Sequence, residues 1–143
     1  MARFNPNAKT LSYCLEKLKT ANAKAGFSQT GTITTSRDNS SKRAAQFLKV
    51  TNVPKGFKKF MLPVHMADTC VMYTSVGAPD TKVATHSHDE GDGFRFIVSG
   101  SIIYKDQELT SGDWMHIPAG KKYAFTVGLL GVTMFYCYRC CCA

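Results

Sequence analysis

The sequence lacks any long apolar run: no stretch of its 143 residues approaches the roughly 18 consecutive apolar residues that a membrane-spanning helix requires. The N-terminus, Met-Ala-Arg-Phe-Asn-Pro-Asn, has no apolar core of the kind that secretory signal peptides contain. Basic residues never form a long run, and no nucleic-acid-binding motif is visible. We therefore expect a cytoplasmic protein in a reducing setting, without membrane association and without a nucleic-acid partner.

Cysteine is rare until the end of the chain. Cys14 and Cys70 stand alone, and the remaining cysteines crowd the C-terminus as Cys137, Cys140, Cys141 and Cys142. The tail contains a C-x2-C pair, but no second pair follows at the spacing of a zinc site. We expect free thiols at a frayed chain end. Redox chemistry, metal capture and an intermolecular disulfide are the alternatives.

Length and charge limit the class of protein. A chain of 143 residues suits one domain with a sizeable core, and 44% hydrophobic and 20% charged residues are ordinary for a globular protein. The formal net charge is +8, from 18 Lys and Arg residues against 10 Asp and Glu residues. Many of the basic residues lie in the N-terminal half. Such a charge can attract anionic small molecules toward a cleft.

The N-terminal part predicts one helix followed by irregular structure. Residues 8–24 carry an apolar stripe at helical spacing, formed by Leu11, Leu15 and Leu18. Gly26 follows the last turn, as a C-terminal stop signal does. Residues 28–43 are rich in Ser, Thr, Gly and Asn and predict a loop or a short edge hairpin.

From residue 44 onward the pattern predicts strands only. The candidate strands are short, β-branched and aromatic, with turn residues between them, and they cover residues 46–50, 58–64, 69–76, 82–86, 93–98, 101–104, 113–117, 123–127 and 132–138. Many short strands without a helical period predict an antiparallel sandwich or barrel. We therefore expect an all-β domain over residues 44–143, with residues 1–43 as an N-terminal helix and loop extension.

Two histidines are the clearest candidate for a functional site. In a strand, residues i and i+2 point to the same face, so His86 and His88 can direct two imidazoles at one point. Imidazole is a good ligand for zinc, iron, copper and nickel. The alternative is a pair of exposed histidines in a polar loop.

A second stretch, residues 112–125, reads as turn, strand, turn and strand. Together the two stretches resemble the paired motifs of the cupin superfamily, G-x5-H-x-H-x3-4-E-x6-G and G-x5-P-x-G-x2-H. The residues that match at the family spacing are His86, His88, Gly100, Gly112, Pro118 and Gly120. The resemblance covers about residues 70–138 and implies a cupin-type jelly-roll β-barrel with a helical N-terminal extension.

The ligand positions depart from the family pattern. The motif glutamate falls on Gly93, with Asp92 beside it, and the histidine of the second motif falls on Tyr123. Either Asp92 supplies the carboxylate from a shifted position, or the site is unusual, or metal binding has been lost. His116, on the strand before Tyr123, can supply a third imidazole if it points inward.

Strand alternation decides which side chains accompany the two histidines. If the intervening loop keeps the family register, alternate residues from Gly93 to Ile97 face inward, and Arg95 can bind a substrate carboxylate. A slip by one residue turns Asp92 inward instead, which completes a site of two histidines and one carboxylate typical of non-haem iron. A third arrangement has Arg95 in solvent or paired with Asp92 or Glu90. The sequence leaves these open.

Tyr123 has three candidate roles. It can ligate a metal as phenolate, act as a general acid or base, or pack in the core with its hydroxyl satisfied. Arg95 and Tyr123 are thus the candidate catalytic residues. The candidate metal ligands are His86, His88, Asp92, Tyr123 and His116.

The resemblance implies a metal-dependent enzyme that acts on a small organic anion, such as a carboxylate, by dioxygenase-type oxidation at Fe(II). Zn(II), Ni(II) and Mn(II) are the alternative metals. Two other functions stay open: a non-catalytic cupin that binds or senses a metal or ligand, and a metal-free isomerase or lyase that uses His and Tyr as acid and base. Because small barrels often bury exposed edges by pairing, we also expect a homodimer.

Overall fold

The computed structural model describes residue 5, residues 7–67 and residues 70–139. The chain forms two compact units, here called the helical unit (Met1–Ser28 and Asp38–His65) and the barrel unit (Gln29–Arg37 and Met66–Ala143). This division differs from a simple boundary after residue 43. The helical unit extends to residue 65, and residues 29–37 belong with the sheet.

Helix α1 (Leu11–Ala25) confirms the helix predicted from the leucine stripe. Its N-terminus is capped by Thr10, whose side chain accepts a hydrogen bond from the Tyr13 N–H at 3.2 Å. At the other end Gly26 has φ of +64°, a left-handed conformation that glycine adopts without steric cost. Only part of the stripe is covered, since Leu18 is buried and Leu11 is 71% exposed.

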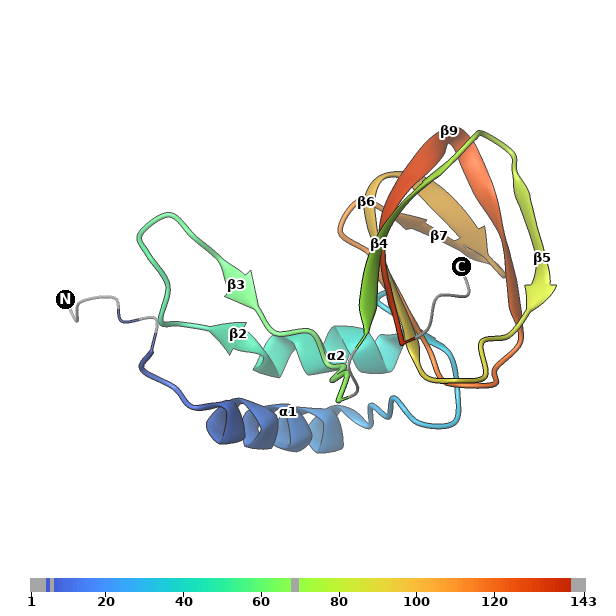
Figure 1. Ribbon diagram of the computed structural model, residues 1–143. Coiled ribbons are helices and arrows are strands. Elements are labelled where there is room, and N and C mark those ends of the chain that lie inside the picture. The colour runs from blue at the N-terminus through green and yellow to red at the C-terminus, as the bar shows by residue number, and fades with distance from the viewer. Residues whose placement is uncertain (1–4, 6, 68–69, 140–143) are drawn as a thin grey trace. The chain divides into compact units, whose positions relative to one another are not determined.

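Helix α2 (Asn39–Phe47) was not predicted, because its Asn and Ser residues resemble turn formers. The helix begins after Asp38 in an extended conformation, and its alanines are strong helix formers. It contacts α1, and the Arg43 guanidinium donates to the carbonyl of Ala25 at 3.1 Å. The strand predicted over residues 46–50 is therefore wrong at its start: only β2 (Lys49–Val50) is extended, and it pairs with β3 (Lys59–Phe60) in a short hairpin (Figure 1).

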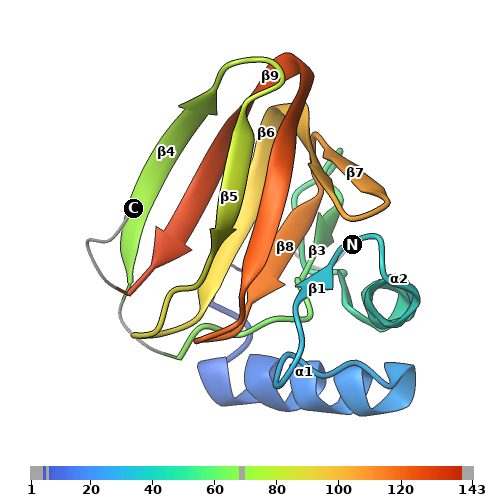
Figure 2. The same ribbon diagram turned by 90° about the vertical axis from the view of Figure 1, so that its right-hand side faces the viewer.

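The barrel unit holds one seven-stranded sheet in which every pair is antiparallel (Figure 2). The path runs β1-β8-β6-β9-β4, and β5 pairs with β9 while β7 pairs with β6. The strands are β1 (Thr34–Thr35), β4 (Val71–Gly77), β5 (Lys82–His86), β6 (Gly93–Tyr104), β7 (Gln107–Thr110), β8 (Trp114–Ile117) and β9 (Tyr123–Tyr138). The predicted strand start at Thr69 lies outside the described residues.

The two longest strands, β6 and β9, were each predicted as two short strands separated by a turn. In the structure each runs on through glycines, with irregular register in β6 around Ile97 to Ile102. Gly100 has φ of +70°, and a Cβ at this position would lie 2.0 Å from the Gly131 carbonyl oxygen. Glycine therefore allows the two strands to approach each other where they bend, which is visible for β9 in both views (Figures 1 and 2).

Because β9 bends, it pairs with two other strands besides β6. Its first half pairs with β5 and its second half with β4, so the sheet curls around one apolar core. The core side chains come from β6, β7, β8 and β9 and include Ile97, Ile102, Leu109, Met115, Ile117, Phe125, Val127, Val132 and Met134. The predicted fold class, an all-β jelly-roll barrel with a helical N-terminal segment, is confirmed.

Cys70 and Cys137 form a disulfide that joins the residue before β4 to β9. The sequence reading, which left Cys70 alone and Cys137 as a free thiol, was wrong here, because residues 67 positions apart meet only through the β4–β9 pairing. The cysteines at 140–142 lie outside the described residues. No helix in the described ranges is long and apolar enough to cross a membrane.

Candidate functional site

The two motif histidines lie at the end of β5 and just beyond it, and their rings come together. The ring centroids of His86 and His88 are 5.1 Å apart. His86 pairs with Tyr123 in the β5–β9 register, and their ring centroids are 4.5 Å apart. The Nδ1 atom of His86 lies 2.8 Å from the Ala84 carbonyl oxygen, so it is the protonated nitrogen. This leaves Nε2 of His86 with its lone pair.

Arg95 and Tyr123 form the buried centre of the site. The guanidinium donates to the Tyr123 hydroxyl oxygen from Nη2 at 2.9 Å and from Nε at 3.3 Å. Arg95 is 8% exposed and Tyr123 is 3% exposed. The Tyr123 hydroxyl also lies 3.4 Å from Nε2 of His88. The phenol therefore links a buried cation to an imidazole.

The strand register places Arg95 on the inner face of the sheet. Arg95 is opposite Met115 of β8, a core residue, whereas Phe94 is opposite His116. Directly opposed residues share a face, and neighbours along a strand alternate. The register in which Arg95 faces inward is therefore the one observed, and the one-residue slip does not occur.

Asp92 and His116 lie together, on the face opposite Arg95. The Nε2 atom of His116 is 3.0 Å from a carboxylate oxygen of Asp92, and the other oxygen accepts from the Ala119 N–H at 3.0 Å. His116 is fully buried. Burial lowers the pKa of His116, although the Asp92 carboxylate opposes this shift. The structure thus brings His86, His88, Tyr123 and Arg95 together and places Asp92 and His116 as a separate pair.

Electrostatics keep His88 neutral near pH 7. Burial lowers the pKa of His88, and the neighbouring His86 and Arg95 side chains lower it further, while Asp89 acts in the opposite sense. A neutral imidazole can accept a proton from a ligand.

Tyrosines of β9 complete the site, and the sequence reading did not single them out. Tyr136 is opposite Arg95, and its ring centroid lies 4.0 Å from the guanidinium carbon. The Tyr136 hydroxyl is buried without a hydrogen-bond partner among the described residues, and burial raises its pKa. Tyr138 lies against His88, with ring centroids 4.5 Å apart. Their spacing of two along a predicted strand was the available signal.

Two of these side chains, His86 and Arg95, line a cavity of about 520 Å³ in the barrel unit, here called the barrel pocket. Its polar lining includes His86 and Arg95, and its apolar lining includes Val83, Phe125 and Met134. Such a volume and a mainly apolar lining with few polar groups are typical of small-molecule sites.

The donor atoms at this site do not fit a resident divalent metal. In the described ranges no group of three or more His, Cys, Asp and Glu side chains could hold an ion. Two imidazoles converge, but the next polar neighbours are the Tyr123 phenol and the Arg95 guanidinium, a cation that opposes a second cation. Metal sites usually have at least three protein ligands.

No family model matches the sequence, and no curated protein matches it. A solved structure from Ralstonia eutropha JMP134, a protein of unknown function with a cupin-like fold, is 19% identical with a TM-score of 0.45 and covers 50% of this chain. The match covers 51% of that structure, so this chain spans about half of its length.

Two further structures are similar. A cupin protein from Bacteroides fragilis is 19% identical with a TM-score of 0.39, and the match covers 63% of this chain and 90% of that one. A variant of salicylate 1,2-dioxygenase from Pseudoaminobacter salicylatoxidans in complex with gentisate is 13% identical with a TM-score of 0.42. The match covers 94% of this chain and 38% of that one. The antiparallel barrel that the sequence predicts rests on the sheet topology of the barrel unit itself, and these likenesses assign no function.

Proposed function

We propose that the barrel pocket binds a small organic carboxylate and transfers a proton of that ligand, as a metal-free isomerase or lyase. The observation that carries this proposal is the buried guanidinium of Arg95, which has no carboxylate partner among the described residues. The argument has three steps: anion binding, proton removal and stabilisation of the resulting charge.

Anion binding falls to Arg95. A buried guanidinium requires an anionic or polar partner, and here Nε and Nη2 donate to the Tyr123 hydroxyl oxygen. The stacked Tyr136 ring holds the guanidinium plane in place. Because Arg95 lines the barrel pocket, a ligand carboxylate can accept hydrogen bonds from it there.

Proton removal falls to His88. Its lowered pKa makes it a neutral base at pH 7, and its Nε2 already accepts from the Tyr123 hydroxyl at 3.4 Å. For a 2-oxo acid that displaces the Tyr123 hydroxyl from Nε2 of His88, the proton would leave the carbon next to the carbonyl group and move to that nitrogen. The electron pair of the broken C–H bond would then form an enolate.

Charge stabilisation falls to the tyrosines. The enolate oxygen needs a hydrogen-bond donor. The buried Tyr136 hydroxyl forms no hydrogen bond with any described residue, so it can donate to the enolate. Burial raises the pKa of Tyr136, so it stays a neutral donor over the physiological range. A fixed donor in a buried site stabilises a developing oxyanion.

A second candidate, metal-dependent oxidation at Fe(II), is favoured by one observation. The Ala84 carbonyl holds Nδ1 of His86 and frees Nε2, which is the arrangement that orients metal-binding imidazoles. With only two imidazoles, an ion such as Fe(II), Zn(II), Ni(II) or Mn(II) would depend on the ligand or water for its other donors. We therefore rank this candidate second.

Deuterium exchange tests the first candidate directly. Chelator-treated protein should exchange the C3 protons of pyruvate for deuterium in D₂O, as followed by proton NMR. Arg95→Gln should abolish this exchange, and Arg95→Lys should recover part of it. Lys121→Gln removes an exposed charge elsewhere in the barrel unit and should change nothing. Exchange that requires added Fe(II) would favour the second candidate. If a panel of 2-oxo acids gives no exchange with or without metal, the proposed proton transfer is contradicted.

A further inference from the structure

The helical unit carries all of the chain's excess positive charge. It contains 11 of the 18 Lys and Arg residues and 2 of the 10 Asp and Glu residues, a net charge of +9. The barrel unit has a net charge of −1. A basic unit of this kind attracts anions to its own surface.

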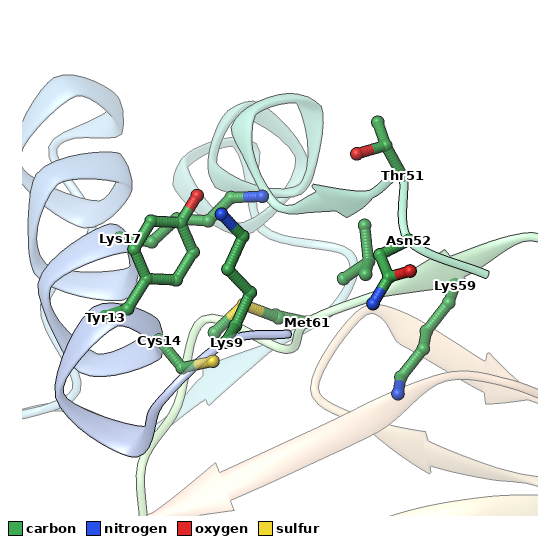
Figure 3. A pocket seen from close by; sticks show the side chains of 9 residues that line it. Lys9, Tyr13, Cys14, Lys17, Thr51, Asn52, Lys59 and Met61 are labelled. Atoms are coloured by element: carbon green, nitrogen blue, oxygen red, sulfur yellow. The ribbon is translucent and has the colours of Figure 1, made fainter. Parts of the chain in front are cut away.

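Within this unit lies a cavity of about 260 Å³, here called the lysine pocket (Figure 3). It lies between the start of α1 and the segment that contains β2 and β3. Three of its lining residues are lysines, and none is acidic: Lys9, Tyr13, Cys14, Lys17, Val50, Thr51, Asn52, Lys59 and Met61. The pocket thus combines several positive charges with apolar side chains.

Lys17 and Lys9 are held in place without any carboxylate. The Lys17 ammonium donates to the Lys49 carbonyl oxygen at 2.8 Å, which leaves two of its three N–H groups for a ligand. The Lys9 ammonium lies 4.3 Å from the Tyr13 ring centroid, a cation–π contact. Among the described residues, none of Lys9, Lys17 and Lys59 forms an ion pair. Mutual repulsion of such charges is relieved when an anion binds.

The amide of Asn52 is committed elsewhere. Its Nδ2 donates to the Asn5 carbonyl oxygen at 2.5 Å, and its Oδ1 lies 3.4 Å from the Asn5 N–H. Recognition of a charged ligand group in the lysine pocket therefore rests on the ammonium groups. Lysine acts on phosphate as a point charge, without the planar geometry with which arginine binds carboxylates.

We propose that the lysine pocket binds a phosphomonoester with a small apolar body. The dianionic phosphate would lie between the Lys9 and Lys17 ammonium groups. The apolar body would contact Tyr13, Val50 and Met61, which line the same cavity. The volume is just below the range of drug-sized sites and suits a compact ligand. This site is independent of the function proposed for the barrel pocket.

Calorimetry with phenyl phosphate tests the proposal on the full chain at low ionic strength. The double variant Lys9→Gln/Lys17→Gln should raise the dissociation constant by about tenfold or more, since several charge-assisted hydrogen bonds are lost. The matched control Lys19→Gln/Lys42→Gln removes the same charge from exposed positions of the helical unit that do not line the pocket. It should raise the constant by less than about twofold.

Cys14 provides a second readout that does not depend on variants folding. It is a free cysteine that lines the lysine pocket. Phenyl phosphate should slow alkylation of Cys14 by iodoacetamide, measured on the peptide that contains it, whereas phenol should not. Unchanged alkylation at saturating phenyl phosphate would overturn the proposal, as would equal weakening in the pocket and control variants.

Two binding experiments distinguish a free phosphomonoester from the phosphate of a lipid head group. Binding of phenyl phosphate without binding of phosphatidate-containing vesicles supports a free phosphomonoester. Vesicle binding that phosphatidylcholine alone does not give, and that the pocket variant loses, supports a lipid head group. An oligonucleotide that binds where phenyl phosphate does not, and that both double variants weaken equally, would indicate diffuse polyanion binding and overturn the lysine pocket as the site.

Discussion

Arg95 of β6 and Tyr136 of β9 face each other across the centre of the sheet, with the guanidinium carbon 4.0 Å from the ring centroid. The two residues are direct register partners, so their contact is fixed by the strand pairing. A stacked guanidinium keeps its edge free for hydrogen bonds. The Tyr123 hydroxyl takes up part of that edge, and the barrel pocket adjoins it.

Tyr123→Phe should reduce proton exchange by about tenfold or more, because the Tyr123 hydroxyl positions both Arg95 and His88. It should also lower the free energy of unfolding by about 1–3 kcal/mol, because it removes the acceptor of a buried guanidinium. Denaturant titration and NMR exchange on the same preparation separate the two effects. Wild-type exchange in this variant would remove Tyr123 from the mechanism.

The exchange rate should depend on pH through His88. The base must be neutral, and its pKa lies below the usual value near 6.5. The exchange rate should therefore change little with pH around pH 7. It should fall as the pH drops through the lowered pKa of His88. A rate that rises toward acid pH would show that the imidazolium, acting as an acid, is the required form.

Asp113 should make the barrel unit sensitive to acid. Burial raises the pKa of Asp113, but hydrogen bonds from the Thr110 N–H and the Ser36 hydroxyl, with the nearby Arg37 charge, outweigh this and leave the pKa below its usual value. A lowered carboxylate pKa stabilises the fold above the unfolded value near 3.9, and this contribution is lost as the pH falls through the folded value.

Asp113→Asn should remove that contribution. The variant should be less stable than the wild type at pH 7, by about 1–3 kcal/mol for lost charge-assisted hydrogen bonds, and the difference should shrink below about pH 4. Urea titrations at a series of pH values measure it. A difference that stays constant with pH would mean that the carboxylate charge does not contribute.

Gly100→Ala should destabilise the barrel more than Gly112→Ala. Both glycines have positive φ, of +70° and +87°, so each substitution carries the cost of about 1–2 kcal/mol for a left-handed residue. Only at Gly100 would the new methyl group meet a backbone atom, the Gly131 oxygen, whereas at Gly112 nothing lies within 4 Å. Thermal denaturation should therefore give a clearly larger loss for Gly100→Ala. Equal losses would contradict the close approach of β6 and β9.

The predicted homodimer remains to be measured. β4 ends the path of the sheet, and its Met72 and Val76 side chains are exposed. An apolar edge that pairs with no further strand in the described ranges favours association with a second copy. Light scattering should give twice 15.7 kDa, and a mass near 15.7 kDa at high concentration would reject the dimer.

Local pattern was sufficient to predict much of the barrel and part of the site. The motif spacing brought His86, His88 and Tyr123 together, whereas alternation left the direction of Arg95 open until the β6–β8 register fixed it. The Cys70–Cys137 disulfide depends on a pairing of strands far apart in the sequence, which local pattern does not show. Gly100 was read as part of a turn, because a positive-φ glycine marks a turn and a strand bend equally well.

The surroundings of Asp92 also could not be predicted from the local sequence pattern. Its carboxylate was a candidate metal ligand because it lies one residue from the motif position, but a strand places neighbouring residues on opposite faces. Its observed partner, His116, comes from β8, 24 positions away. Only the β6–β8 register decides between these two environments.

The most direct test is a titration of pyruvate into chelator-treated protein, with wild type, Arg95→Gln and Arg95→Lys compared by calorimetry. We predict that metal-free wild-type protein binds the carboxylate, that Arg95→Gln weakens binding by about tenfold or more, and that Arg95→Lys recovers part of the loss. Binding that appears only after a divalent metal is added, and that Arg95→Gln leaves unchanged, would contradict a site organised around Arg95.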